Sequence, residues 1–257
     1  MNLFLSDTLQ LLKRHIRATL RLPIWIAVTL IQPVIWITIF GQLFQRVVDI
    51  PGFENNSYIA FLTPGVVIMT AMFGSAWSGM GLIEDLNQGV VDRMLSTPVK
   101  RGAIIAARVL HASITVIVQS LIIIGLGIIL GAKIPSGFLG IIGILIVSIL
   151  IAAGFSSIST GIALLTRREE TMIAVINFFG LPLTFLSASF MANSLMPNWM
   201  QNIAIINPVN WAVNAARSSM AGNDFSILFN NGLLLILFTL FAGVFAYKSF
   251  NIHQKRN

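Results

Sequence analysis

Charged residues are scarce in this chain of 257 residues, of which only 10% are Asp, Glu, Lys or Arg and 56% are hydrophobic. Soluble domains contain about 25% charged residues on average, so this chain lacks the charge to cover an aqueous surface. The mean hydropathy of +0.87 points the same way. The composition therefore predicts an integral membrane protein.

Cysteine is absent, which excludes disulfides and thiolate chemistry. The sequence also lacks HExxH, GxSxG and the phosphate-binding GxxxxGK[ST] loop. Its three histidines, His15, His111 and His253, lie far apart near predicted membrane boundaries. We therefore expect a chain that is not an enzyme and carries no catalytic residue, metal or cofactor.

Acidic residues are also few, nine in all, and each falls in a predicted loop or at the end of a predicted span. An ion-coupled transporter usually places a titratable carboxylate inside its helix bundle, so this distribution argues against one. Glu84 nevertheless lies close to a span, and His111 lies one turn inside another. An ATP-independent secondary transporter or a channel-like bundle therefore stays open as the alternative function.

Six apolar runs are long enough to cross a hydrocarbon core, which needs about 20 residues. Basic residues precede the first run and no small-residue cleavage site follows it, so we expect it to be retained as an anchor. Residues 192–226 are too polar for a lipid-exposed span and are predicted to form short re-entrant or interfacial helices, an extracytoplasmic cap. The predicted spans are 22–44, 58–83, 103–130, 138–166, 171–191 and 227–247.

Residues 1–21 have the periodicity of an amphipathic helix. Leu5, Leu9 and Leu12 recur at steps of three and four, and Arg14 and Arg17 fall on another side. A basic polar face of this kind is typical of a helix that lies in the membrane interface and contacts lipid. The expected fold is thus a single all-α membrane domain over the whole chain, with an interfacial N-terminal helix and six spans.

Basic residues are distributed unevenly about these spans. Six spans place both termini on one side, and all but Arg46, Lys133 and Arg217 of the 16 Lys and Arg residues then fall on that side. Lys and Arg near span ends are enriched in the cytoplasm. We therefore expect a multi-pass protein of the plasma (inner) membrane with both termini cytoplasmic. The net charge of +7 then requires no nucleic-acid partner.

The longest polar insert between apolar runs is 84–101, which the same argument places in the cytoplasm. Glu84 to Leu95 is predicted to form about three turns of helix. The helix is expected to end near Pro98, because a proline disfavours helical conformation in the residue before it. The chain holds no energy source of its own, so this segment is interpreted as a docking site for a separate ATPase. A solvated loop without a partner is the alternative.

Within that helix, three apolar side chains are expected to gather on one side, with two charged ones flanking them. The predicted docking residues are Val91, Asp92, Arg93, Met94 and Leu95. Polar side chains within the spans are candidates for a substrate path, although each could equally bind neighbouring helices. These candidates are Gln119, Ser156 and Asn177.

The stretch from Gly89 to Val99, with Arg101 close behind, resembles the signature loop of type-2 ATP-binding-cassette (ABC) exporter permeases. These include the daunorubicin-resistance-like drug exporters and the polysaccharide exporters. Thr63-Pro64-Gly65 and Asn207-Pro208-Val209 extend the resemblance over nearly the whole chain.

The resemblance implies a permease subunit that pairs with a second copy, as a homodimer, or with a paralogue. Two ABC ATPase subunits would carry the ATP and Mg. A coupling helix within 84–97 would sit in a cleft of the ATPase, the N-terminal helix would lie against the same subunit, and 192–226 would cap the exit. Transport would be outward, of a hydrophobic drug or antibiotic or of a lipid-linked glycan.

Overall fold

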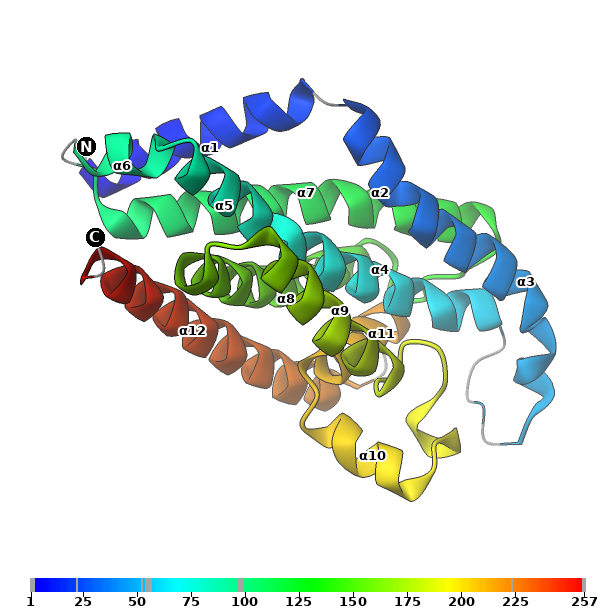
Figure 1. The fold of residues 1–257 in the computed structure, drawn as a ribbon. Helices are drawn as coiled ribbons and strands as arrows, with labels where there is room; N and C mark the ends of the chain where they lie inside the picture. The colour runs from blue at the N-terminus through cyan, green and yellow to red at the C-terminus, as the bar shows by residue number, and fades with distance from the viewer. Residues whose placement is uncertain are drawn as a thin grey trace.

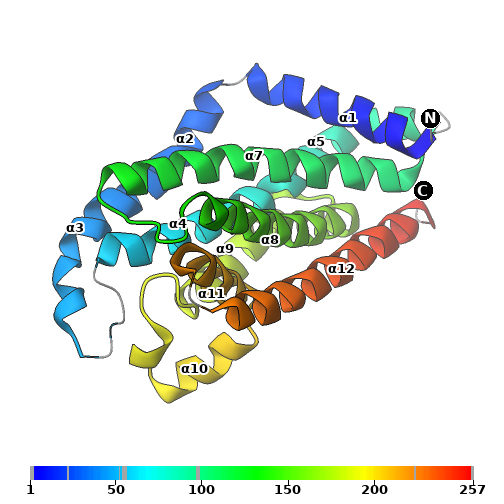
Figure 2. The same ribbon diagram turned by 180° about the vertical axis from the view of Figure 1, so that it is seen from behind.

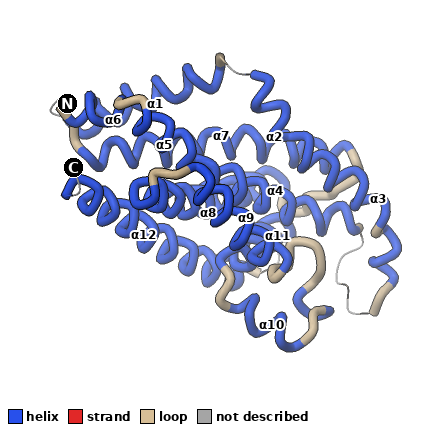
Figure 3. Tube along the Cα trace, in the orientation of Figure 1, coloured by secondary structure: helices blue, strands red, loops and turns tan. Residues whose placement is uncertain are grey.

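The computed structural model of the protein describes residues 3–21, 23–51, 53, 57–96, 99–222 and 224–255. Figure 3 shows helices joined by short connections, and these residues include no strand. The all-α prediction is confirmed. The start of α1 (Leu3–Leu20) and the end of α12 (Phe225–Lys255) lie at the same end of the molecule (Figures 1 and 2).

Four helical stretches are long and apolar enough to cross a membrane, and they coincide with four of the predicted spans. The first, Tyr58–Asn87, consists of α4 (Tyr58–Ala76), the 3-10 turn η3 (Trp77–Gly79) and α5 (Met80–Asn87). The others are α7 (Arg101–Ile129), α8 (Gly137–Thr166) and Phe225–Ile252 of α12.

The other two predicted spans correspond to shorter helices. Residues 22–44 correspond to α2 (Pro23–Ile35), the π-helical turn η1 (Trp36–Phe40) and α3 (Gly41–Leu43), which the 3-10 turn η2 (Gln45–Asp49) follows. Residues 171–191 correspond to α9 (Glu169–Phe185), which ends six residues before the predicted boundary. Pro182 lies near that end, and a proline inside a helix removes a backbone hydrogen bond.

Helix α8 is the centre of the bundle and packs against α4, α7, α11 and α12 (Figures 1 and 2). Glycines make the contact with α12 possible, because a Cβ at Gly154 or Gly161 would overlap the ring of Phe238 or Phe245. Small residues at such positions let membrane helices approach closely and gain van der Waals contact. Large apolar side chains such as Ile144 and Ile151 are fully buried beside them.

Residues 192–226 form the 3-10 turn η4 (Asn193–Leu195), α10 (Asn198–Ile205) and α11 (Pro208–Ala221). The predicted short helices are present, but α11 is not peripheral. Val209, Ala212 and Ala216 are fully buried, and α11 packs on α4, α8 and α12. The many polar side chains of this region predicted a cap outside the bundle. Several of them instead point from the start and the length of α11 at backbone groups inside the bundle.

Those backbone groups belong to the last turn of α9 and to the non-helical segment that follows it. Asn207 donates from Nδ2 to the carbonyls of Leu183 and Leu186, at 2.7 and 2.9 Å, and Asn210 accepts from the amide of Ala188 at 2.9 Å. Arg217 donates to the carbonyls of Ala188 and Ser189, and its guanidinium lies 3.5 Å from the centroid of the Phe61 ring. Non-helical backbone at membrane depth requires such partners.

Candidate functional site

The polar insert contains two helices where one was predicted. The continuous helix from Glu84 to Leu95 is wrong, because α5 ends at Asn87 and α6 (Val90–Leu95) begins after a break. Gly89 lies at the break with φ +66°, in the left-handed region that glycine adopts readily. The helix at Val90–Leu95 is present. Pro98, the predicted stop signal, lies outside the described residues.

The five predicted docking residues differ in their surroundings. Val91 is 1% exposed and packs with Leu82, Ile83 and Ile104 of its own chain. The predicted apolar face of α6 is therefore partly occupied from within, and Val91 anchors the helix rather than facing outward. Arg93 is exposed and Met94 is half-buried. The side chains of the remaining two, Asp92 and Leu95, lie outside the described residues.

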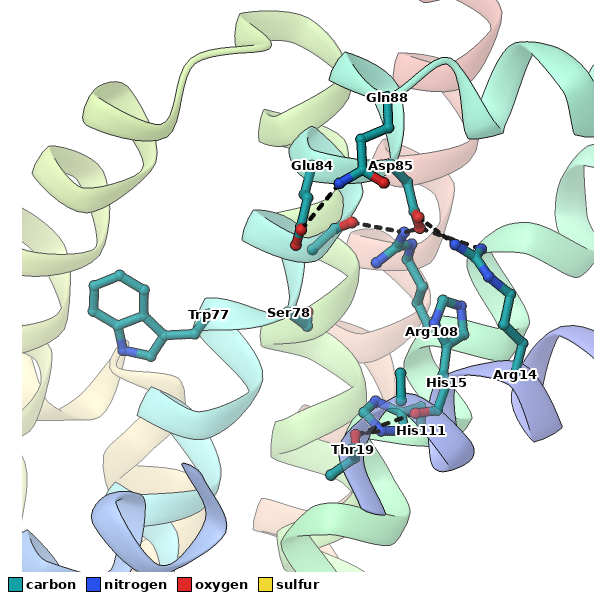
Figure 4. Close-up of a pocket in the computed structure, with 12 residues that line it drawn as sticks. Arg14, His15, Thr19, Trp77, Ser78, Glu84, Asp85, Gln88, Arg108 and His111 are labelled. Atoms are coloured by element: carbon teal, nitrogen blue, oxygen red, sulfur yellow. Dashed lines mark hydrogen bonds and ion pairs between the residues drawn. The ribbon is translucent and has the colours of Figure 1, made fainter. Parts of the chain in front are cut away.

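Beside α6, three charged side chains from three helices meet. Arg14 of α1 bonds Oδ1 of Asp85 from Nη2 at 2.5 Å, and Arg108 of α7 bonds Oδ2 of the same carboxylate (Figure 4). Arg108 also donates to the carbonyl of Gly81 at 3.1 Å. The Asp85 and Arg108 side chains are only 13% and 7% exposed. Both charges are paired, which makes their burial tolerable, while the buried Nε of Arg108 has no hydrogen-bond partner among the described residues.

Sequence reasoning missed this cluster. By sequence, Asp85 falls in a loop or at a span end, Arg14 on the basic face of the N-terminal helix, and Arg108 in the first turns of a span on the cytoplasmic side. The separations of 71 and 23 residues from Asp85 follow no helical period. The sequence therefore held no local signal that these side chains meet.

The two histidines nearest the cluster also contact each other. The rings of His15 in α1 and His111 in α7 are 5.7 Å apart, and Thr19 bonds Nε2 of His111 at 2.8 Å. Burial, with a contribution from the Arg108 guanidinium, lowers the pKa of His15 to about 3. His15 is thus neutral at physiological pH and packs α1 on α7.

A cavity of about 370 Å³ lies between α1, η3–α5 and α7 (Figure 4). It is lined by polar side chains, including Arg14, Glu84, Gln88 and His111, and by Trp77. Both of its guanidinium groups bind the Asp85 carboxylate, while the Glu84 carboxylate accepts a hydrogen bond from Gln88. Among the described residues, no group of three or more His, Cys, Asp or Glu side chains is placed to hold a metal ion.

The structure places the three predicted path residues in different settings. Gln119 is 3% exposed and donates to the hydroxyl of Thr29 at 3.1 Å. Ser156 is fully buried and shares a hydrogen bond of 2.9 Å with Ser78. Both side chains therefore bind neighbouring helices, which was the alternative to a role in the substrate path. Asn177 is exposed on α9, beside the exposed rings of Phe178 and Phe179.

The fold and this end of the bundle together define a polytopic helical membrane protein with a short helix between two of its spans that presents Arg93 to solvent. The sequence model of the ABC-2 type transporter family matches residues 6–221. The chain therefore belongs to the ABC-2 type transporter family. Membership implies a multi-pass membrane permease that works with an ABC ATPase partner.

Named relatives agree with this assignment. The transport permease ycf38 of Cyanophora paradoxa is 32% identical over 216 residues, which is 83% of this chain and 74% of the relative. The daunorubicin resistance ABC transporter permease protein DrrB1 of Streptomyces coeruleorubidus is 27% identical over 252 residues, 98% of this chain and 87% of the relative. The inner membrane transport permease YadH of Escherichia coli K12 is 27% identical over 235 residues, 85% of each chain.

Proposed function

We propose that this chain is the membrane half of an ATP-driven exporter of the plasma (inner) membrane, paired with a second copy or a paralogue. Each half would cross the membrane six times, with both termini in the cytoplasm. Two ABC ATPase subunits would hold ATP and Mg and drive the permease through α6. The substrate would be a hydrophobic drug or antibiotic, or a lipid-linked glycan.

The observation that carries this proposal is the position of α6. It lies at the same end of the bundle as both termini, between two helices of span length, and it presents Arg93 to solvent (Figure 1). Val91 fixes its inner side to the bundle. A short helix that is anchored on one side and polar on the other can receive a soluble partner without losing its place on the spans.

The faces of α1 support an interfacial position. Thr8, 3% exposed, lies on the side that packs against α7, whereas Leu9 and Leu20 are 50% and 68% exposed. Lys13 and Arg17 are exposed on a further side. Much of the apolar stripe is thus left exposed, with Leu12 half-buried. An exposed apolar stripe next to a basic one fits a helix that lies in the headgroup region.

Asn177 supports the proposal that one face of α9 contacts another protein chain or water instead of lipid. An amide facing hydrocarbon lacks hydrogen-bond partners, which is costly, yet Asn177 is exposed within an apolar stretch of α9. We place this face against the second copy, where the two Asn177 side chains would line a path between the halves. Gln119 and Ser156, which bond within the chain, would support that path only indirectly.

The docking claim is tested by reversing the charge of Arg93 or by introducing a charge at Met94. Arg93→Glu or Met94→Asp is expected to reduce co-purification of the partner ATPase and its stimulation by the permease, while the purified chain alone hydrolyses no ATP. Arg46→Glu is the matched control, because Arg46 is exposed in η2, outside the docking region. Equal ATPase binding by Arg93→Glu, Met94→Asp and Arg46→Glu would contradict the docking assignment.

The competing function is transport without ATP. Both carboxylate oxygens of Asp85 are occupied by Arg14 and Arg108, which leaves that group poorly suited to exchange with a transported ion. Transport by reconstituted vesicles that contain only this chain, driven by an imposed proton gradient, would favour the alternative.

A further inference from the structure

Helix α6 is flanked by non-helical residues on both sides, Gln88 and Gly89 before it and Ser96, Val99 and Lys100 after it. Before it, Gly89 has φ +66°, and nothing lies within 4 Å of the position a Cβ would take there. After it, α7 does not begin until Arg101. Val91 holds one side of this six-residue helix on the bundle, but with a non-helical joint at each end the helix would still turn about that contact when a partner pushed it. Transmission of a push to the spans therefore requires a further constraint.

Helix α1 supplies this constraint, because it is bonded to both flanks of α6. Arg14 bonds Asp85, which precedes the Gly89 break. Asp7 accepts a hydrogen bond from the backbone amide of Lys100, directly before α7, at 3.3 Å. Asp7 and Arg14 are two helical turns apart and therefore lie on nearly the same side of α1. One rigid helix thus bridges both joints.

The Asp85 carboxylate also connects this bridge to the bundle. Its second oxygen is bonded by Arg108 of α7, whose side chain is 7% exposed (Figure 4). Three helices, α1, α5 and α7, therefore share one carboxylate. The contact between Arg14 and Asp85 is the more exposed arm, since the Arg14 side chain is 41% exposed.

We propose that Asp85, Arg14 and Asp7 are positioning residues that make α1 a strap across the two joints, so that α1 and α6 move as one unit. The inference rests on the proposed function, since it assigns α6 to the ATPase. It adds that a displacement of α6 reaches the spans through α1 and α7 instead of being lost by bending at Gly89.

Arg14→Gln is the most selective test, because it removes the exposed arm and leaves the buried pair of Asp85 and Arg108 in place. Arg17→Gln is the matched control: it removes the same charge from the same helix, and Arg17 is exposed without an ion pair among the described residues. Arg14→Lys keeps the charge and is expected to restore the contact in part.

The chain has no cysteine, so paired spin labels can be introduced without background. Gln10→Cys on α1 and Ser96→Cys after α6 are both exposed positions. The distance between these labels is measured in the complex with the partner ATPase, without nucleotide and after trapping with ATP and vanadate. A second pair, Ser96→Cys with Ile252→Cys on α12, reports movement of α6 against the bundle.

In the parent complex, the distance between α1 and α6 is expected to stay constant on trapping while the distance between α6 and α12 changes. In Arg14→Gln, the distribution of distances between the labels on α1 and after α6 is expected to broaden. The detached fraction rises by up to about fivefold, the factor equivalent to ~1 kcal/mol for an exposed ion pair. Arg14→Lys narrows the distribution again, and Arg17→Gln matches the parent.

Two failures can be told apart. If the parent binds the ATPase and α6 moves, but Arg14→Gln and Arg17→Gln give the same distribution, the strap is wrong and the proposed function stands. If the ATPase does not bind the permease that carries only the spin labels, the proposed function is overturned and the strap with it.

Discussion

Replacement of Asp85 by asparagine should measure how strongly the three-helix junction stabilises the protein. The substitution leaves Arg108, whose side chain is 7% exposed, without its carboxylate. Breaking a buried ion pair by removing one partner costs about 3–5 kcal/mol. The asparagine carbonyl and the Gly81 carbonyl remain as acceptors for Arg108, so we expect a loss near the lower end, ~3 kcal/mol. The Arg14 arm adds at most ~1 kcal/mol, because that side chain is 41% exposed.

The assay is thermal unfolding of the purified protein in detergent, followed by the loss of the monodisperse peak in size-exclusion chromatography. For a chain of this size, ~1 kcal/mol corresponds to a shift of roughly 2–4 °C. Asp85→Asn, which removes both arms and costs ~3–4 kcal/mol, is therefore expected to lower Tm by roughly 6–16 °C. Arg14→Gln serves as the comparison, with an expected decrease of at most roughly 2–4 °C.

A double-mutant cycle separates the interaction energy between Asp85 and Arg108 from the separate effect of each substitution on stability. Arg108→Met alone should destabilise the protein by leaving Asp85 partly unpaired, whereas Asp85→Asn combined with Arg108→Met removes the buried cation as well. The double variant is expected to be more stable than Asp85→Asn alone, since an apolar replacement of a buried ion pair is often neutral. Strictly additive losses would refute the reasoning that these two groups stabilise each other.

Two further predictions follow from packing and protonation. Gly154→Ala should destabilise the protein by ~1–3 kcal/mol through overlap with Phe238, whereas Gly243→Ala in α12, with nothing within 4 Å, should be neutral or stabilising; equal Tm values for the two variants would contradict this. Because burial lowers the pKa of His15 to about 3, its contribution to stability is complete above the unfolded value of 6.5 and is lost as pH falls from 6.5 towards 3. Stability should fall by up to ~1.4 kcal/mol per pH unit in that window, and His15→Gln should flatten the Tm profile between pH 7 and 5; an unchanged profile would count against it.

Much of the fold follows from patterns that repeat along the sequence. Apolar runs of sufficient length marked four helices that the structure confirms as candidates to span a membrane. The N-terminal periodicity likewise marked α1, which is helical from Leu3 to Leu20. Both signals are local, because helix formation and the thickness of the hydrocarbon core depend on consecutive residues.

The candidate site was less predictable, because it depends on single backbone angles and on distant contacts. One left-handed residue, Gly89, separates α5 from α6. The inward direction of Val91 depends on the position of that break and on Ile104 of another helix. The docking roles of Arg93 and Met94 stay predictions.

The side chains that satisfy the backbone after α9 have a consequence for biogenesis. The carbonyls of Leu186, Ala188 and Ser189 are bonded by Asn207 and Arg217, which are synthesised later than α9 itself. Until α11 arrives, the end of α9 would expose unpaired backbone groups to lipid, which is unfavourable. In the proposed six-span topology, α9 and α11 would therefore enter the membrane together, and a chain truncated before α11 is expected to be cleared by quality-control proteases.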